Sequence, residues 1–286
     1  MPLVRCTTVA ELRAELAVMR RAGRRVALVP TMGALHEGHL RLVDAARRLA
    51  DEVVVSVFVN PLQFGPREDL ARYPRDLERD ATLVHDRGAS LLFAPTIPEM
   101  YPEGATTRVR PGPAADRWEG AVRPGHFEGV LTVVAKLFHL VGPEVAVFGR
   151  KDVQQAMLIR RMVADLDFPV EIAVVPTVRE ADGLALSSRN AYLSPAERTD
   201  ALALSRGLRA ARELWQAGER SAGRLRDAVA GVLASVDGLV PDYIAVVEPG
   251  QLAPVATTPA GTVIAIAARV GATRLLDNTI LGEDDV

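Results

Sequence analysis

Two histidines three residues apart could do chemistry on a phosphate. His36 and His39 lie in the segment Pro30–His39, which follows the apolar run Val26–Val29 and opens a helical stretch. At this spacing both imidazoles can point the same way, and a helix start favours phosphate oxygens through its N–H groups and dipole. Gly38 removes a side chain where a nucleotide could approach the backbone, and imidazoles can donate to charge developing on a phosphate. The pattern indicates attack at the α-phosphate of a nucleotide.

Three other interpretations compete for this segment. Gly33 and Gly38 have the glycine spacing of a P-loop, but His39 and Leu40 stand where that motif requires Lys and Ser/Thr. A zinc site would need a third and a fourth ligand, and the neighbouring sequence offers none. The third interpretation is that His36 and His39 are ordinary capping or core histidines. Other segments of the chain are needed to choose between these interpretations.

A second polar segment, Gly149–Gln155, also follows an apolar run and opens a helix. Lys151 can hold a phosphate there, and Asp152 can accept hydrogen bonds from ribose hydroxyls. A solvated first helical turn would contain the same two residue types. The segment therefore supports a nucleotide site only together with the histidines.

A third polar segment, Asp182–Asn190, places two hydroxyls and a guanidinium in one loop, at Ser187, Ser188 and Arg189. Such a loop can close on the β- and γ-phosphates, with the arginine neutralising departing pyrophosphate. A turn followed by a helix cap at Ser194 is the competing interpretation.

Apolar runs of strand length alternate with helical stretches in the first part of the chain. Strands are expected at 26–29, 53–59, 90–94, 145–148 and 170–175, with helices at 8–22, 40–49, 75–87, 127–141 and from 152. Strands joined by helical crossovers predict an α/β fold with a doubly wound, parallel, Rossmann-like sheet. Ligands then bind beyond the carboxyl ends of the strands, where His36, His39 and Lys151 are expected.

After Pro176 the pattern changes to a polar loop and two long helical stretches, at 195–217 and 221–235. Strands are then expected near 242–248, 262–269 and 273–277. We therefore expect two domains, a Rossmann-like domain over 1–176 and a smaller α+β domain over 177–286.

The charge balance excludes partners that are recruited by a strong overall field. The chain has 34 basic and 36 acidic residues and a formal net charge of -2, so neither nucleic acid nor an anionic membrane is an expected partner. Cys6 is the only cysteine, which excludes an intrachain disulfide and a cysteine-rich zinc site. Met1–Thr8 lacks the pattern of a signal peptide, and we expect a cytoplasmic protein.

Five segments closely resemble motifs of the pantothenate synthetase family, within the wider group of nucleotidyl-transferring α/β enzymes. They are Pro30–His39, Phe58–Phe64 (Phe-Val-Asn-Pro-Leu-Gln-Phe), Arg123–Phe127, Lys151–Gln155 and Ser187–Leu193. The resemblance runs from about residue 8 to 281. It implies ATP-dependent condensation of (R)-pantoate with β-alanine through a pantoyl adenylate, with AMP and pyrophosphate released, in coenzyme A precursor synthesis. It also implies a homodimer, and magnesium that accompanies ATP with unassigned protein ligands.

The resemblance assigns roles to residues of this chain. Catalysis would rest on His39, His36, Lys151 and Arg189. ATP would contact Met32, Gly33, Ala34, Leu35, His36, Glu37, Gly38, His39, Gly149, Arg150, Lys151, Asp152, Val178, Leu186, Ser187, Ser188 and Arg189. Pantoate would contact Gln63 and Gln155, with Val133, Val134 and Leu137 walling its dimethyl group, and the smaller domain would act as a lid. Arg123 and His126 could meet a carboxylate, and the Arg150 side chain is expected at a variable surface position.

Two rival functions stay open at this stage. A nucleotidyltransferase that leaves a nucleotide on its product would use the same paired histidines. A nucleotide-binding regulator without catalysis would need binding alone, and the intact set of histidines, Lys151 and Arg189 speaks against it.

Overall fold

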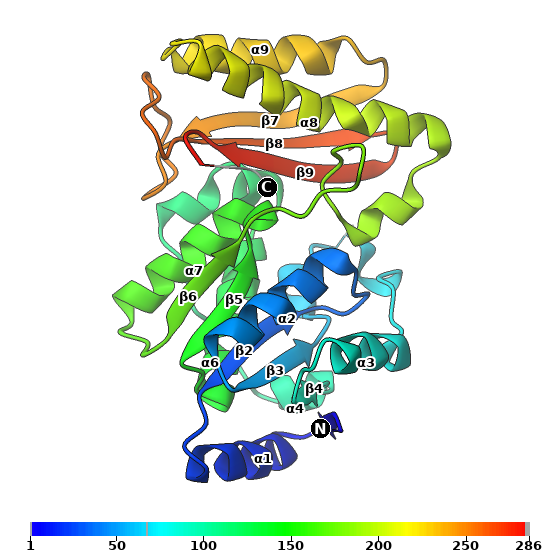
Figure 1. The fold of residues 1–286 in the computed structure, drawn as a ribbon, viewed down its shortest axis with the longest axis vertical. Helices are drawn as coiled ribbons and strands as arrows, with labels where there is room; N and C mark the ends of the chain where they lie inside the picture. Colours follow the sequence, from blue (N-terminus) through cyan, green and yellow to red (C-terminus); the bar gives the residue numbers. More distant parts are fainter. Residues whose placement is uncertain (1, 67, 284–286) are drawn as a thin grey trace. The chain divides into compact units, whose positions relative to one another are not determined.

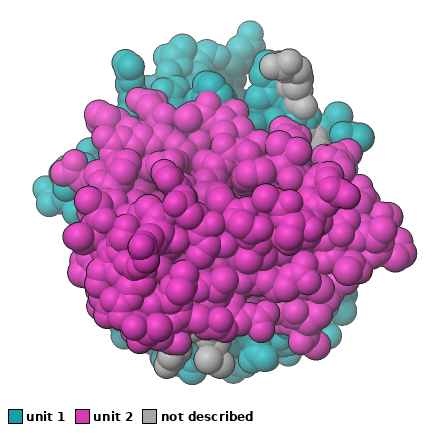
Figure 2. Space-filling view, turned by 90° about the horizontal axis from the view of Figure 1, so that it is seen from above, with its two compact units in different colours: residues 1–112, 123–149, 158–175 teal, residues 113–122, 150–157, 176–286 magenta. Residues whose placement is uncertain are grey.

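The computed structural model describes residues 2–66 and 68–283. The described chain divides into two compact units, shown in different colours in Figure 2. The first comprises the described residues of 1–112, 123–149 and 158–175, and the second those of 113–122, 150–157 and 176–286. Two segments that the sequence places within the first domain, 113–122 and 150–157, are thus grouped with the second unit.

The first unit contains a six-stranded parallel sheet (Figure 1). Its strands follow the order β1-β4-β3-β2-β5-β6. Their bounds are Val4–Cys6 (β1), Val26–Thr31 (β2), Glu52–Val57 (β3), Leu91–Phe93 (β4), Val145–Gly149 (β5) and Glu171–Val175 (β6). The order reverses at β2, which has β3 on one side and β5 on the other. This confirms the predicted doubly wound fold, and it makes the carboxyl end of β2 the expected ligand position.

Helices of the first unit connect these strands. They are α1 (Val9–Arg21), α2 (Glu37–Leu49), α3 (Leu77–Asp86), α4 (Ile97–Met100) and α6 (His126–Val141), while α7 (Val153–Asp165) begins in a segment of the second unit. The expected capping box starts α1, because Glu11 N donates to Thr8 Oγ1 (3.2 Å) and Thr8 N to Glu11 Oε2 (3.1 Å). Leu12 and Leu16 are fully buried one turn apart, as the helical spacing predicts.

The core of this unit is mainly aliphatic. Residues 26–29 of β2 and 53–56 of β3 are buried without a break, as expected for strands covered on both faces. Val43 and Ala46 on α2 pack into the same cluster as Val29 and Val55. The sheet and α2 therefore form a rigid base for the turn that joins them.

The second unit is built on a three-stranded antiparallel sheet, β7 (Leu239–Val247), β8 (Val263–Val270) and β9 (Thr273–Ile280). Two helices, α8 (Pro195–Gln216) and α9 (Ala222–Ala234), lie on one side of it (Figure 1). Leu204 and Leu225 from these helices share a buried cluster with Ile264 of β8. The smaller α+β architecture is thus as the sequence predicts.

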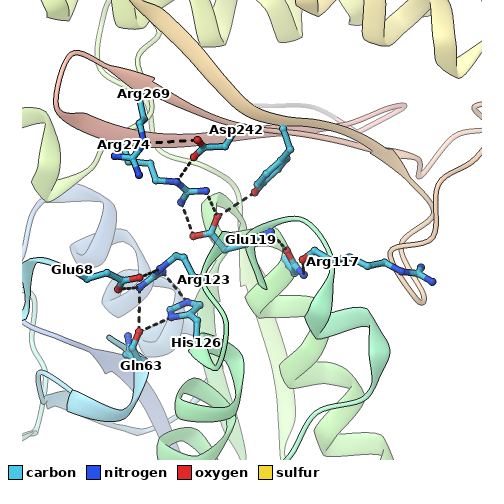
Figure 3. Close-up of polar contacts among 11 residues, drawn as sticks. Gln63, Glu68, Arg117, Glu119, Arg123, His126, Asp242, Arg269 and Arg274 are labelled. Atoms are coloured by element: carbon cyan, nitrogen blue, oxygen red, sulfur yellow. Dashed lines mark hydrogen bonds and ion pairs between the residues drawn. The ribbon is translucent and has the colours of Figure 1, made fainter. Parts of the chain in front are cut away.

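The segments 113–122 and 150–157 belong to this unit because they contact the same sheet. Val153 and Trp118 pack with Val247 and Val263 of β7 and β8. Arg274 on β9 donates to both carboxylate oxygens of Glu119 at 2.7 and 2.8 Å (Figure 3). These contacts join residues about 100 positions apart or more, and no local sequence pattern indicates them.

The elements that the sequence does not predict are all short. The strand β1 and the helices α4 and α5 (Glu119–Val122) have three or four residues each, which is too short for a periodic pattern. Within the described residues, no helix combines the length and apolarity that a membrane span needs.

Candidate functional site

The turn between β2 and α2 depends on one glycine. Gly33 has φ +84°, and a Cβ built there would lie 2.9 Å from Asp80 Oδ2 and 3.0 Å from Val57 Cγ1. The next residue, Ala34, also has a positive φ, of 51°. Because any side chain at 33 would collide and be strained, the turn requires glycine at this position.

A buried carboxylate holds this turn. Asp80 on α3 accepts hydrogen bonds from Ala34 N (2.9 Å, Oδ2) and Leu35 N (2.8 Å, Oδ1), and its side chain is 1% exposed. Burial raises the pKa of the Asp80 carboxyl, while the two N–H groups work in the opposite direction. These two amides are therefore already hydrogen-bonded within the unit, and Asp80 fixes the backbone that leads into His36.

His36 and His39 form a capping box made of imidazoles. His36 is the N-cap of α2 and its Nδ1 accepts from Gly38 N (3.1 Å), while His39 Nδ1 accepts from His36 N (3.4 Å). The ring centroids lie 4.1 Å apart. Because Nδ1 of each ring accepts a hydrogen bond, the proton of each neutral ring is on Nε2. Both predicted catalytic residues are thus held together as Nε2–H tautomers, which suits donation to a phosphate oxygen.

Gln63 lies at the end of the 3₁₀ helix η1 (Pro61–Gln63), in the segment that follows β3. Its Oε1 accepts from Asn60 Nδ2 (3.0 Å), which directs the amide Nε2 to Met32 Sδ at 3.0 Å. Asn60 is itself 1% exposed and receives a hydrogen bond from Tyr101 Oη (3.0 Å). A predicted pantoate residue and a predicted ATP residue therefore meet beyond the ends of β2 and β3.

The helix α6 packs closely on η1. A Cβ at Gly129 would lie 2.2 Å from Leu62 O, so α6 can approach this turn only at a glycine. The predicted substrate residues Val133, Val134 and Leu137 are all buried on α6, at 2 to 7% exposure. Almost every residue of α6 is buried, so this burial fits a core stripe as well as a substrate wall.

In the second unit, a 3₁₀ turn, η4 (Arg150–Asp152), follows β5. Asn278 of β9 holds it by donating to the carbonyls of Arg150 and Lys151, both at 2.9 Å. Lys151 is half-buried and Asp152 is exposed. The expectation of a surface position for Arg150 is wrong: its side chain is 6% exposed and Nη1 pairs with Glu283 Oε2 at 2.8 Å.

Neighbouring glutamines at the start of α7 differ in their surroundings. Gln154 is buried, accepts from Glu119 N (3.1 Å) and donates to the carbonyls of Ala114 and Arg117 (3.0 Å each). Gln155, the predicted pantoate residue, is half-buried. Gln154 is therefore used to hold the segment 113–122, and of the two only Gln155 is a candidate for binding substrate.

The loop with the predicted phosphate residues is ordered by its own hydrogen bonds. Leu186 N donates to Val178 O (2.9 Å), which pairs two residues predicted to line the ATP site. Ser187 caps η5 (Ser188–Tyr192) by accepting from Arg189 N (3.3 Å). Ser188 and Arg189 thus stand in the first turn of a short 3₁₀ helix, whose Arg189 and Asn190 N–H groups already donate to Ser187.

Several residues that shape the first unit's site were not predicted. Asp80 and Glu68 stand in charged stretches that match no motif, and only the three-dimensional structure shows their contacts. Asn60 could have been found, since it precedes Pro61 within the matched segment Phe58–Phe64 and caps the turn that carries Gln63.

The parallel sheet, its switch point at β2 and the histidine-capped helix after β2 define the class of doubly wound α/β enzymes that act on nucleotides. The family model for pantoate-beta-alanine ligase matches residues 5–280. Pantothenate synthetase of Geobacter sulfurreducens is 52% identical over 277 residues, with 97% of this chain and 98% of the relative covered. Pantothenate synthetase of Thermus thermophilus is 57% identical over 273 residues, covering 95% and 97%.

Two solved structures support the same family assignment. The crystal structure of pantothenate synthetase from Thermus thermophilus has a TM-score of 0.92 at 54% identity, with 97% of this chain and 99% of that chain covered. The pantoate-beta-alanine ligase from Francisella tularensis, in complex with beta-gamma ATP and beta-alanine, has a TM-score of 0.79 at 30% identity, covering 99% and 100%. The chain belongs to the pantoate-beta-alanine ligase family.

Proposed function

We propose that this chain catalyses the ATP-dependent condensation of (R)-pantoate with β-alanine through a pantoyl adenylate. The observation that carries the proposal is family membership over residues 5–280, nearly the whole chain. The family member from Francisella tularensis, described above, was solved with an ATP ligand and β-alanine. The nucleotide of the first step and the amine of the second are therefore those expected here.

In the first step the pantoate carboxylate attacks the α-phosphorus of ATP, and pyrophosphate leaves. His39, assisted by His36, donates Nε2–H to the phosphate oxygens on which charge develops. The tautomer set by the capping box supports this role. Lys151 and Arg189 neutralise the β- and γ-phosphates, with the hydroxyls of Ser187 and Ser188 as further donors.

In the second step the amine of β-alanine attacks the mixed anhydride and AMP is released. Positioning and charge stabilisation account for both steps, and no covalent enzyme intermediate is needed. Gln63 and Gln155 bind the hydroxyl and carboxylate groups of pantoate through their amides, and Val133, Val134 and Leu137 contact its methyl groups. The position of Gln63 Nε2 beside Met32 supports this assignment in the first unit.

Magnesium enters as part of the MgATP substrate. It keeps several waters and binds phosphate oxygens with few protein ligands. Within residues 2–66 and 68–283, no three His, Cys, Asp or Glu side chains group as a metal site would require. We further propose that the protein is cytoplasmic and, from the family resemblance, a homodimer whose smaller domain, 177–286, acts as a lid; sedimentation of the purified protein tests the dimer.

The test is to incubate the purified protein with MgATP, D-pantoate and β-alanine and to follow AMP, ADP and pantothenate. Equal amounts of AMP and pantothenate without ADP are expected. Pantoate labelled with ¹⁸O in its carboxylate should transfer one label to AMP, because the attacking oxygen stays on phosphorus when the amine displaces AMP. ADP formation, an adenylylated final product, or binding of ATP without turnover would each refute the proposal.

A further inference from the structure

The main-chain carbonyl of Gln63 is held by two side chains from the segment that leads into α6 (Figure 3). His126 Nδ1 lies 2.8 Å from Gln63 O, and Arg123 Nη2 donates to the same oxygen at 3.2 Å. Arg123 is in turn held by Glu68, with Nε on Oε1 at 2.8 Å and Nη2 on Oε2 at 2.6 Å. We call Glu68, Arg123 and His126 the brace.

The brace fixes the proton position on His126. Arg123 Nη1 lies 3.1 Å from His126 Nε2, and a guanidinium can only donate, so Nε2 must be the acceptor. The neutral ring then carries its proton on Nδ1 and donates it to Gln63 O. This is the tautomer opposite to that of His36 and His39, although all three rings are in the same unit.

The brace is more deeply buried than the exposed ion pairs of the unit. The side chains of Arg123 and Glu68 are 16% and 25% exposed, and His126 is 9% exposed. Arg5 and Glu78 make a similar two-oxygen contact at 2.8 and 2.9 Å, but their side chains are 46% and 78% exposed. Ordering three partly or fully buried side chains around one carbonyl costs entropy and desolvation, which a plain surface turn does not require.

We propose that Glu68, Arg123 and His126 are positioning residues for pantoate, acting through Gln63. The brace holds the main-chain carbonyl of Gln63, and Asn60 holds its side-chain Oε1. The side-chain amide Nε2 is therefore directed toward Met32. This inference rests on the proposed function, since it takes Gln63 as a pantoate ligand. None of the three brace residues has to touch the substrate for the effect.

The kinetic test is Glu68→Gln, which keeps the shape of the side chain and removes its charge. The KM for pantoate should rise about tenfold, as expected when a ligand side chain loses its preorganisation, while the KM values for ATP and β-alanine stay within about twofold. Arg123→Lys should raise the pantoate KM as well, because a lysine keeps the charge but loses the fork that reaches three acceptors. Glu78→Gln is the matched control, with unchanged kinetics.

A second measurement does not depend on activity. In protein labelled with ¹⁵N-histidine, the His126 signals, identified by their loss in His126→Gln, should report a neutral Nδ1–H ring. Arg123→Met should let the Nε2–H form appear, because the donor to Nε2 is gone. An Nε2–H ring in the wild-type protein, or an unchanged pantoate KM in Glu68→Gln, would overturn the brace. If the wild-type protein forms no AMP with pantoate, the proposed function fails, and the tautomer measurement alone decides whether the brace holds Gln63.

Discussion

Replacing Asp80 by Asn tests how strongly one buried carboxylate controls the predicted phosphate site. Asp80 accepts a hydrogen bond from Ala34 N on one carboxylate oxygen and from Leu35 N on the other. Because Asp80 is buried, water cannot replace either hydrogen bond. The amide of Asn offers one acceptor, so one of the two N–H groups loses its partner and faces an NH₂ group instead. His36 follows this turn directly and is the cap of α2.

The magnitude follows from the two hydrogen bonds. A hydrogen bond to a charged group contributes about 1.5–3 kcal/mol, and an unsatisfied buried donor costs about 1–3 kcal/mol. We expect Asp80→Asn to lower the free energy of unfolding by about 2–3 kcal/mol. The turn before His36 also loses its anchor, and a displacement of about 1 Å at a catalytic group can cost about 10²-fold. We expect kcat for AMP formation to fall at least about tenfold.

Asp76→Asn is the matched control, since it makes the same chemical change at the cap of the same helix. Asp76 caps α3 by accepting from Arg79 N (3.0 Å) at an exposed position, and Asn caps helices as well as Asp does. Urea denaturation and the AMP assay should therefore leave it near the wild type. If Asp80→Asn matched this control in both measurements, the role we give to Asp80 would be refuted.

Four further predictions concern single side chains. His39→Ala should lower kcat by about 10² or more if Nε2–H stabilises the transition state, and an unchanged rate in folded protein would contradict that role. Gly129→Ala should destabilise the protein by about 1–3 kcal/mol and weaken pantoate binding, because the new methyl group clashes with η1. Gly231→Ala on α9, where nothing lies within 4 Å, should have neither effect. Urea denaturation and the KM for pantoate test both variants. Burial on its own would raise the pKa of Glu68, but the hydrogen bonds and charge of Arg123 leave it below the ordinary value. The ionised Glu68 carboxylate should therefore stabilise the protein fully above about pH 4.3, and this stabilisation should be lost as pH falls through the lower pKa of the folded state. Urea denaturation of the wild type and of Glu68→Gln, at about pH 7 and in acid, measures the difference. Burial raises the pKa of Cys6 to about 11, so a thiol reagent should label it only after unfolding, and Cys6→Ser should keep full activity.

The long elements could be predicted because each carries its own periodic signal. The strands β2 and β3 contain the apolar runs Val26–Val29 and Val53–Val55, and α1 begins with a capping box and an apolar repeat. Such signals depend on neighbours within a few residues. The strand β1 was missed since its three residues are too few for a period, although pairing with β4 defines it in the structure.

The candidate site could be predicted only where its residues stand in local motifs. His36 and His39 are three residues apart, and a helix start brings any such pair together. Asp80 is 46 residues from Ala34 in the turn that it holds, and nothing in its local sequence indicates the contact. The partner of Arg150 is equally remote: Glu283 lies 133 residues further along the chain, so a charged side chain that looked like a surface residue is in fact buried.

The histidine pair shows why local spacing predicts a position but leaves the chemistry undetermined. Spacing places two imidazoles at the start of α2, but it does not say which nitrogen of each ring carries the proton. The backbone decides this, because the N–H groups of Gly38 and His36 occupy both Nδ1 atoms. The same two bonds make the histidines part of the helix cap, so an alanine at position 39 removes a cap and a donor together. Comparing His39→Glu with His39→Gln separates the two effects: both retain an acceptor at the capping-box position, but only Gln retains an N–H that could reach a phosphate. If the rate depends on donation, Gln should keep more activity than Glu at equal stability, whereas wild-type activity in both variants would assign the histidine to the cap alone.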